Sequence, residues 1–299
     1  MGNYPTPLLG LAIGDALGMP FETRRPDDPF LKAWDGFTYL NSEYHKLNPG
    51  QWTDDTLMST VLAESLIKHG RFVPEDVAGR YCQWYVEGPH RGMGKTTKLA
   101  LQAIHFGVEW THAGVKGAEG NGTAMRAAPL GLFSKDPWKI LDAASLDASI
   151  THKSREAEAG SEAVSLGVGL LASGTTKPRL VDNLLAFLKP SKVKSQLMRI
   201  DRLWDDGLTA QEALVEFGTA AHVVQTVPSA FAAFLLTDSY LEAIQVAIRA
   251  GGDTDTTAAI TGALAGAYYG RDGIPDELVA GLDQADYIEG LDSDLWESR

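Results

Sequence analysis

The sequence has little of what several common kinds of protein site require. Its 299 residues include one cysteine, Cys82, which excludes an internal disulfide and a cysteine-based zinc site. No segment approaches the roughly 18 consecutive apolar residues of a membrane-spanning helix, and the first residues lack the basic and apolar regions of a secretory signal. A lone cysteine is typical of a reducing compartment, so we expect a cytoplasmic protein that does not enter the membrane.

Positive charge is also scarce. Lys and Arg number 26 against 39 Asp and Glu, so the formal net charge is −13. Binding to nucleic acids depends on clustered basic side chains, and we therefore expect no nucleic-acid-binding surface. From about residue 272 the chain holds nine acidic residues and one base, Arg299. This composition is typical of a solvated acidic surface.

Apolar and small residues recur at helical spacing along most of the chain. Ala157, Val164 and Leu171 belong to such a series, which predicts a helix over residues 155–172. Residues 256–269 are almost entirely small, so neighbouring backbones can approach this helix closely, and we expect it at the centre of the fold. Further helices are predicted over 53–68, with Thr53 as N-cap and Gly70 as the stop, over 241–248, and over the shorter segments 97–108, 180–188 and 209–217.

The sequence shows no convincing strand pattern. No alternating run longer than about four residues is bounded by turn residues, and strands do not alternate with helices. The connections at 23–50, 86–95 and 109–128 are irregular and rich in Gly and Pro, but none separates two independent cores. We therefore predict an all-α fold with a single domain over residues 1–299, and we expect a monomer.

Two acidic clusters are the strongest candidates for a site, because each lies where a predicted helix begins. The first reads Thr-Asp-Asp-Thr over residues 53–56, and the second reads Gly-Gly-Asp-Thr-Asp-Thr over residues 251–256. Taken singly, each could be ordinary helix capping. Four carboxylates brought together would repel one another unless a cation neutralised them. Oxygen ligands from Asp and Thr suit Mg²⁺ or Mn²⁺ better than zinc.

Three further features are weaker when taken alone. The glycine-flanked turn at residues 119–126 would expose N–H groups that can cradle a diphosphate, although a turn followed by a helix cap is the simpler interpretation. Glu22 follows a glycine-rich stretch and could be a surface carboxylate. His152 precedes a long helix, and a lone histidine is more often structural than functional.

Taken together, these segments resemble the signature of the ADP-ribosylglycohydrolase family, which includes dinitrogenase-reductase-activating glycohydrolases. The resemblance extends from residue 8 to about residue 275, and the doubled pattern of aspartates and threonines is its most specific part. The segments that carry it, in chain order, are 14–18 with Glu22, 53–56, 120–122 with Met125 and Arg126, 151–152 and 251–256.

The resemblance implies an orthogonal helical bundle around a cleft that holds two Mg²⁺ or Mn²⁺ ions. Its implied metal ligands are Thr53, Asp54, Asp55, Asp253, Asp255 and Thr256, with Asp255 bridging the two ions. Glu22, Asp54 and Asp55 would be catalytic, with Glu22 close to the ribose or the attacking water. The implied contacts to ADP-ribose are Gly120, Asn121, Gly122, Met125, Arg126 and His152, and positions 92 and 222 also belong to the substrate site.

The sequence departs from the family at those last two positions. Members that release ADP-ribose from arginine resemble one another in an aspartate whose place is taken here by Gly92, and no acid occurs between Gly88 and Leu101. A tyrosine of the nitrogenase-associated members corresponds to His222. We therefore expect weak activity on ADP-ribosyl-arginine relative to an O-linked conjugate, and a gain of arginine activity from Gly92→Asp if the loop tolerates a side chain.

The leading interpretation is a metal-dependent hydrolase of the glycosidic bond between ADP-ribose and an acceptor. The acceptor would be a protein side chain or the remainder of a small ADP-ribosyl conjugate. Two alternatives stay open. One is a dimetal hydrolase of another nucleotide-like substrate. The other is a non-catalytic member that binds ADP-ribose or serves a structural role, since the family also includes lens crystallins.

Overall fold

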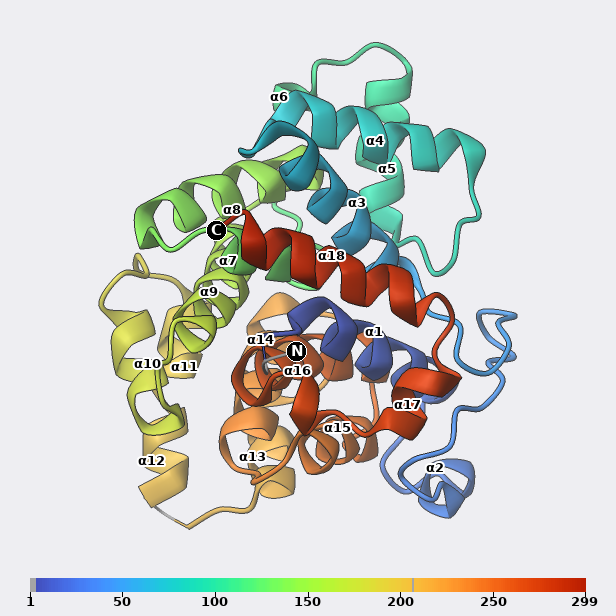
Figure 1. Ribbon diagram of the computed structural model, residues 1–299, viewed down its shortest axis with the longest axis vertical. Helices are drawn as coiled ribbons and strands as arrows, with labels where there is room; N and C mark the ends of the chain where they lie inside the picture. The colour runs from blue at the N-terminus through green and yellow to red at the C-terminus, as the bar shows by residue number, and fades with distance from the viewer. Residues whose placement is uncertain (1–3, 206) are drawn as a thin grey trace.

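The computed structural model describes residues 4–205 and 207–299, and most of that chain is helical (Figure 1). This confirms the all-α prediction. The helices are α1 Pro7–Gly18, α2 Pro29–Ala33, α3 Asp54–His69, α4 Pro74–Glu87, α5 Lys95–His105, α6 Trp110–Ala113, α7 Ala128–Phe133, α8 Pro137–Thr151, α9 Arg155–Ala172, α10 Lys177–Leu185, α11 Lys192–Leu197, α12 Ile200–Asp205, α13 Ala210–Phe217, α14 Val223–Leu235, α15 Tyr240–Arg249, α16 Thr254–Tyr269, α17 Asp276–Gly281 and α18 Ala285–Glu297, with 3₁₀ turns η1 Met19–Phe21 and η2 Arg271–Gly273. None of the helices in this described part of the chain combines the length and hydrophobicity needed to cross a bilayer.

Two very short strands were not expected from the sequence. Strand β1, Val115–Lys116, pairs in parallel with β2, His152–Lys153, and Val115 lies opposite His152. A two-residue strand leaves no alternating pattern to read in a sequence. The pairing fixes the position of His152, the first residue of β2, beside Val115.

Helix α16 forms the centre of the fold, as its small side chains predicted. It packs against α1, α9, α14 and α15, and Figure 1 shows it between α1 and the orange helices α14 and α15. Its residues are buried from Thr254 to Ala267. Since α16 begins at the second acidic cluster, the core of the protein also anchors one half of the candidate site.

Glycines on α1 allow that helix to lie against the backbone of α16. A Cβ placed on Gly14 would lie 2.2 Å from the carbonyl oxygen of Ala258, and one on Gly10 would lie 2.2 Å from that of Gly262. Backbone atoms cannot move aside as a flexible side chain can. The close approach of these two helices therefore requires glycine on α1.

Replacing Gly14 by alanine should strongly destabilise the protein. The new methyl group would force α1 away from α16, and overpacking of this kind costs up to about 3 kcal/mol. Gly79→Ala on α4 is the matched control, because a Cβ there has no neighbour within 4 Å and should stabilise the helix by about 0.5–1 kcal/mol. Urea unfolding of both variants measures the difference, and equal midpoints would contradict the close packing.

The acidic C-terminal segment is largely a solvated surface, as predicted, since six of its nine acidic residues are exposed, but Asp292 is buried. It forms α17 and α18, and α18 lies across α1 and α3 (Figure 1). Asp292 on α18 is fully buried and accepts hydrogen bonds from the N–H groups of Leu8 and Leu9, both at 2.9 Å. Helix α1 has no capping side chain of its own at Thr6, so Asp292 caps it from the other end of the chain. Burial raises the pKa of Asp292 well above its ordinary value despite these bonds.

Candidate active site

The two acidic clusters meet in one cavity of about 220 Å³. Asp54 and Asp55 are the first two residues of α3. Asp253 is the N-cap of α16, and Asp255 is the second residue of that helix. The predicted site residues that line this cavity are Glu22, Asp54, Asp55, Gly92, Gly120, Asn121, Gly122, Met125, His152, Asp253, Asp255 and Thr256. Segments far apart in the sequence therefore form a single site.

Asp15 on α1 holds the first cluster in place. Its carboxylate accepts hydrogen bonds from the backbone N–H groups of Thr53 and Thr56 at 3.0 and 3.1 Å and from their hydroxyls at 2.9 and 2.6 Å. These bonds satisfy N–H groups that the start of α3 leaves free. The sequence analysis assigned Asp15 no role, although a lone aspartate in the apolar, glycine-rich stretch of residues 8–19 was a signal that it has one.

Asp55 connects the two clusters. Its Oδ2 accepts hydrogen bonds from the hydroxyls of Thr53 and Thr256, each at 3.4 Å, while its Oδ1 is buried without a hydrogen-bond partner among the described residues. On the second cluster, Asp253 accepts from the side-chain amide of Asn121, which also donates to the Thr226 hydroxyl at 3.0 Å. An unpartnered buried carboxylate oxygen is costly, so this atom favours a bound cation.

The carboxylates of the site bind protons more tightly than ordinary aspartates do. Burial, followed by the charge of Asp15, raises the pKa of Asp54 to about 7. Burial and neighbouring carboxylates raise the pKa values of Asp55 and Asp255 well above the usual range, and burial raises the pKa of Asp253. A site that disfavours its own negative charges in this way is suited to divalent cations, which would replace the protons.

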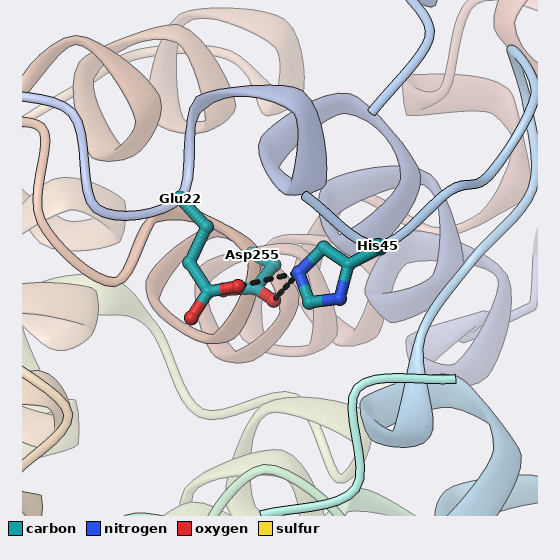
Figure 2. Close-up of side chains that lie close together, drawn as sticks. All are labelled: Glu22, His45 and Asp255. Atoms are coloured by element: carbon teal, nitrogen blue, oxygen red, sulfur yellow. Dashed lines mark hydrogen bonds and ion pairs between the residues drawn. The ribbon is translucent and has the colours of Figure 1, made fainter. Parts of the chain in front are cut away.

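Glu22 lies at the edge of this cluster with His45, a residue that sequence reasoning missed (Figure 2). The His45 Nε2 atom forms an ion pair with Glu22 Oε2 and lies 3.7 Å from Asp255 Oδ2. One donor atom from each of the three residues lies within 4.8 Å of the other two, so they could share a metal ion. Burial lowers the pKa of His45, but the hydrogen bond and charge of Glu22 outweigh it, and the pKa is raised.

The glycine-flanked turn forms the opposite wall. Gly120, Gly122 and His152 lie together, since a Cβ on Gly122 would meet His152 Cε1 at 3.1 Å and one on Gly120 would meet its Nε2 at 3.4 Å. The His152 Nδ1 atom pairs with the Thr151 hydroxyl at 2.8 Å. Burial, followed by the charge of Arg126, lowers the pKa of His152 to about 3. His152 is therefore neutral near pH 7 and can offer a hydrogen bond without adding charge.

The structure places Arg126 behind this wall. Its side chain is fully buried, donates to Asp147 Oδ2 at 2.8 Å and donates to the Gly122 carbonyl at 2.8 Å. Arg126 does not line the cavity. It supports the glycine-flanked turn through the Gly122 carbonyl.

Thr53 and His222 also lie outside the cavity lining. Thr53 is buried and directs its hydroxyl to Asp15 and Asp55. His222 is half exposed, pairs with Glu119 at 3.1 Å and accepts from the Val224 N–H as the N-cap of α14. The neighbouring Ala221 lines the cavity in its place.

Gly92 lies close to Asp54 of the first cluster. It has a φ of +81°, and a Cβ there would lie 2.7 Å from Asp54 Oδ1. Gly92→Asp would therefore strain the loop and press a side chain against a candidate metal ligand. The condition placed on the predicted gain of arginine activity, that the loop tolerates a side chain, is therefore not met at Gly92.

The residues that follow Gly92 form a part of the site that we had not predicted. Lys95, Thr96 and Thr97 line the cavity at the start of α5, and the Gly94 N–H donates to Asp54. The N-terminus of a helix favours anions because its N–H groups are free and its dipole is positive there. This segment thus adds an anion-binding edge beside the acidic cluster.

Comparison with known proteins identifies the class that this fold and site define. The ADP-ribosylglycohydrolase family matches residues 7–299, so the chain belongs to that family. An uncharacterised protein of Archaeoglobus fulgidus is 33% identical over 301 residues, covering 97% of this chain and 94% of that protein. The ADP-ribosylarginine hydrolase Tri1 of Pseudomonas putida is 27% identical over 302 residues, covering 97% and 76%.

A solved structure agrees with this assignment. A chain of an "ADP-ribosylglycohydrolase-related protein complex" superposes with a TM-score of 0.76 at 31% identity, covering 98% of this chain and 96% of that one. The resemblance inferred from the sequence motifs is therefore confirmed at the level of the family and the fold.

Proposed function

We propose that this protein is a metal-dependent hydrolase that cleaves the glycosidic bond between ADP-ribose and an acceptor. The acceptor would be a side chain of an ADP-ribosylated protein or part of a small ADP-ribosyl conjugate. The observation that carries the proposal is the single cavity in which four aspartates and Glu22 face a glycine-flanked turn. The carboxylates fit a metal-assisted attack, and the turn fits a diphosphate.

The residues that would hold two Mg²⁺ or Mn²⁺ ions are those of the two clusters. Asp54, Asp55, Asp253, Asp255 and Thr256, which line the cavity, would hold the ions, and Thr53 would do so through the hydroxyl that it directs toward Asp55. Bound divalent cations orient substrate oxygens and make a coordinated water more acidic. The unpartnered Oδ1 atom of buried Asp55 supports this assignment.

The protein groups have separate tasks in this proposal. Cleavage at the anomeric carbon passes through an oxocarbenium-like transition state, which carboxylates stabilise. Water adds to the anomeric carbon as the bond from that carbon to the acceptor breaks. Glu22 takes the proton of this water at its carboxylate and returns a proton to the departing acceptor, and His45 holds that carboxylate toward Asp255. Asp54 and Asp55 keep the ribose and the water aligned from the opposite cluster.

The remaining lining residues position the ADP part of the substrate. Gly120, Gly122 and Lys95 at the start of α5 line the cavity, and free N–H groups of the turn and of the helix start would balance the charge of a diphosphate. Met125 and neutral His152 shape the wall beside them, and Asn121 ties the turn to Asp253. The catalytic carboxylates and the anion-binding edge would thus contact different ends of one substrate.

Product analysis tests the proposed function. Purified protein should release ADP-ribose from at least one of ADP-ribosyl-arginine, ADP-ribosyl-serine and O-acetyl-ADP-ribose in Mg²⁺ or Mn²⁺, and none in excess chelator. Chromatography of the nucleotide products against free ADP-ribose measures the release. If all three conjugates stay intact while the folded protein binds metal, the hydrolase proposal is wrong.

A further inference from the structure

A fully buried ion pair lies behind the glycine-flanked turn. The guanidinium group of Arg126 donates through Nε to Asp147 Oδ2 and through Nη2 to the Asp147 backbone carbonyl, both at 2.8 Å. Neither side chain is exposed to solvent. Asp147 belongs to α8, and like Arg126 it does not line the cavity. The pair can therefore affect the cavity only through the residues that it contacts.

Tyr81 on α4 completes this buried group, which we call the Arg126 network: Arg126, Asp147 and Tyr81. The Arg126 guanidinium lies 5.2 Å from the centre of the Tyr81 ring, and a cation is attracted to the face of an aromatic ring at such a distance. The Tyr81 hydroxyl lies 3.3 Å from Asp147 Oδ1 and 3.4 Å from the Met58 carbonyl and can donate to either. Met58 lies on α3, one turn after the first acidic cluster. The network thus joins three helices, α3, α4 and α8.

Arg126 also connects this network to the wall of the cavity. Its Nη1 atom donates to the Gly122 carbonyl at 2.8 Å, and Gly122 lies so close to His152 that a Cβ on the glycine would meet His152 Cε1 at 3.1 Å. Asp147 lies on the last turns of α8, directly before His152 in the chain. One guanidinium group therefore holds the turn and, through Asp147, the helix that leads to His152.

Stability alone does not explain an ion pair at this position. Burial removes both charges from water, and apolar side chains of similar size in their place are often as stable or more stable. An apolar pair cannot supply the planar guanidinium group, whose N–H donors have fixed directions. Here those donors are directed at the turn and at α8, so they define the orientation of one relative to the other.

Building on the proposed function, we infer that Asp147 and Tyr81 are positioning residues for ADP-ribose: they orient Arg126, which holds the Gly122 turn in the conformation that receives the diphosphate. None of the three side chains would contact the ligand. Among the described residues, none of them forms a hydrogen bond with Glu22 or with the aspartates of the two clusters. Loss of the network should therefore raise KM and leave kcat nearly unchanged.

The double variant Arg126→Met/Asp147→Val replaces the ion pair by apolar side chains. Its Tm should stay within about 5 °C of wild type. The Kd for ADP-ribose in Mg²⁺, and the KM of whichever conjugate the protein cleaves, should each rise about 10-fold, because the turn loses a hydrogen bond from a charged donor. The kcat should stay within about 3-fold of wild type, since the lost interaction acts on binding.

A milder variant and a matched control accompany it. Tyr81→Phe keeps the ring beside the guanidinium and removes the hydroxyl near Asp147, so ADP-ribose binding should weaken by about 3-fold, the effect of one neutral hydrogen bond. Arg155→Met/Glu162→Leu removes another ion pair, of 2.7 Å, in which Glu162 is buried. Neither of its residues lines the cavity, and the Kd for ADP-ribose should not change.

Calorimetric titration of ADP-ribose, steady-state kinetics and thermal unfolding measure these effects. Wild-type Kd values in both network variants, or losses of kcat and binding that simply follow a lower Tm, would overturn the positioning role and leave the hydrolase in place. If the double variant does not fold, Tyr81→Phe decides alone, and a wild-type Kd there would overturn the inference. Failure of the wild-type protein to bind ADP-ribose or to cleave any conjugate would overturn the proposed function as well.

Discussion

Chelation of divalent cations with EDTA should abolish turnover and lower the Tm by about 5 °C or more, and Mg²⁺ or Mn²⁺ should restore both. Burial, and after it the charge of neighbouring aspartates, raises the pKa values of Asp55 and Asp255. Without cations they must keep protons or repel each other, and either state weakens the site. Activity assays and thermal unfolding, each with EDTA and after addition of excess metal, measure the effect.

The stability of the metal-free protein should also depend on pH, and the pKa of Asp54 gives the direction. The pKa of Asp54 in the folded protein, about 7, is above its unfolded value near 4, so the folded state binds more protons between these pH values. Stability of the metal-free protein should therefore fall as the pH rises through this window. Cations compete with those protons, and the Tm increase caused by Mg²⁺ should be larger at pH 8 than at pH 6.

A control variant shows whether this stabilisation comes from the clusters. Asp55→Asn removes the carboxylate that touches both clusters, and the Mg²⁺-dependent increase in Tm should largely disappear. Full activity in excess chelator, or an equal Mg²⁺ effect in wild type and Asp55→Asn, would refute the metal centre.

Replacing Glu22 by glutamine should lower kcat by roughly 10²–10⁴, the range usual for loss of a general acid or base. Glutamine keeps the length of the side chain and can still contact His45, but it cannot accept the proton of the attacking water. Binding of ADP-ribose should change far less than kcat, because the glycine-flanked turn and the start of α5 are untouched. Steady-state kinetics and calorimetric titration of ADP-ribose into metal-loaded protein separate the two effects.

Two controls test whether the loss of kcat in Glu22→Gln has another cause, such as a general charge effect or the loss of a metal ion. Glu109→Gln, at an exposed position outside the cavity, should retain wild-type kcat. Titration of Mn²⁺ into Glu22→Gln separates loss of the proton acceptor from loss of an ion, because Glu22 could also share a metal ion with His45 and Asp255. A kcat within a few-fold of wild type would mean that Glu22 does not handle the proton. In that case one of the aspartates of the two clusters would be the better candidate for the residue that accepts the proton of the attacking water.

Amphipathic helices and helix boundaries were predictable because their physical signals are local. The series that predicted a helix over 155–172 corresponds to α9, Thr53 caps α3 as expected, and Gly70 ends α3 in a left-handed conformation with φ +61°. Helix α1 was not predicted as a helix. It is buried on every side, so it has no polar face to produce a periodic pattern.

Parts of the candidate site could not be predicted for a related reason. His45 lies in an irregular loop, where no periodicity fixes the direction of a side chain, and its approach to Glu22 and Asp255 depends on how distant segments pack. The placement of Arg126 behind its turn depends on Asp147 of α8. A sequence motif indicates that such residues belong together, but only packing decides which of them face the cavity.

The cap that Asp292 provides for α1 also affects the order in which the protein can fold. A ribosome makes α1 before α18, and the carboxylate that satisfies the Leu8 N–H is made 284 residues after Leu8. Contacts of such long sequence separation form slowly and late. Because Asp15 of α1 in turn holds the start of α3, the nascent chain should bind metal only after α18 has been released. A chain cut before α18 would lose the site although every residue of the cavity was still present.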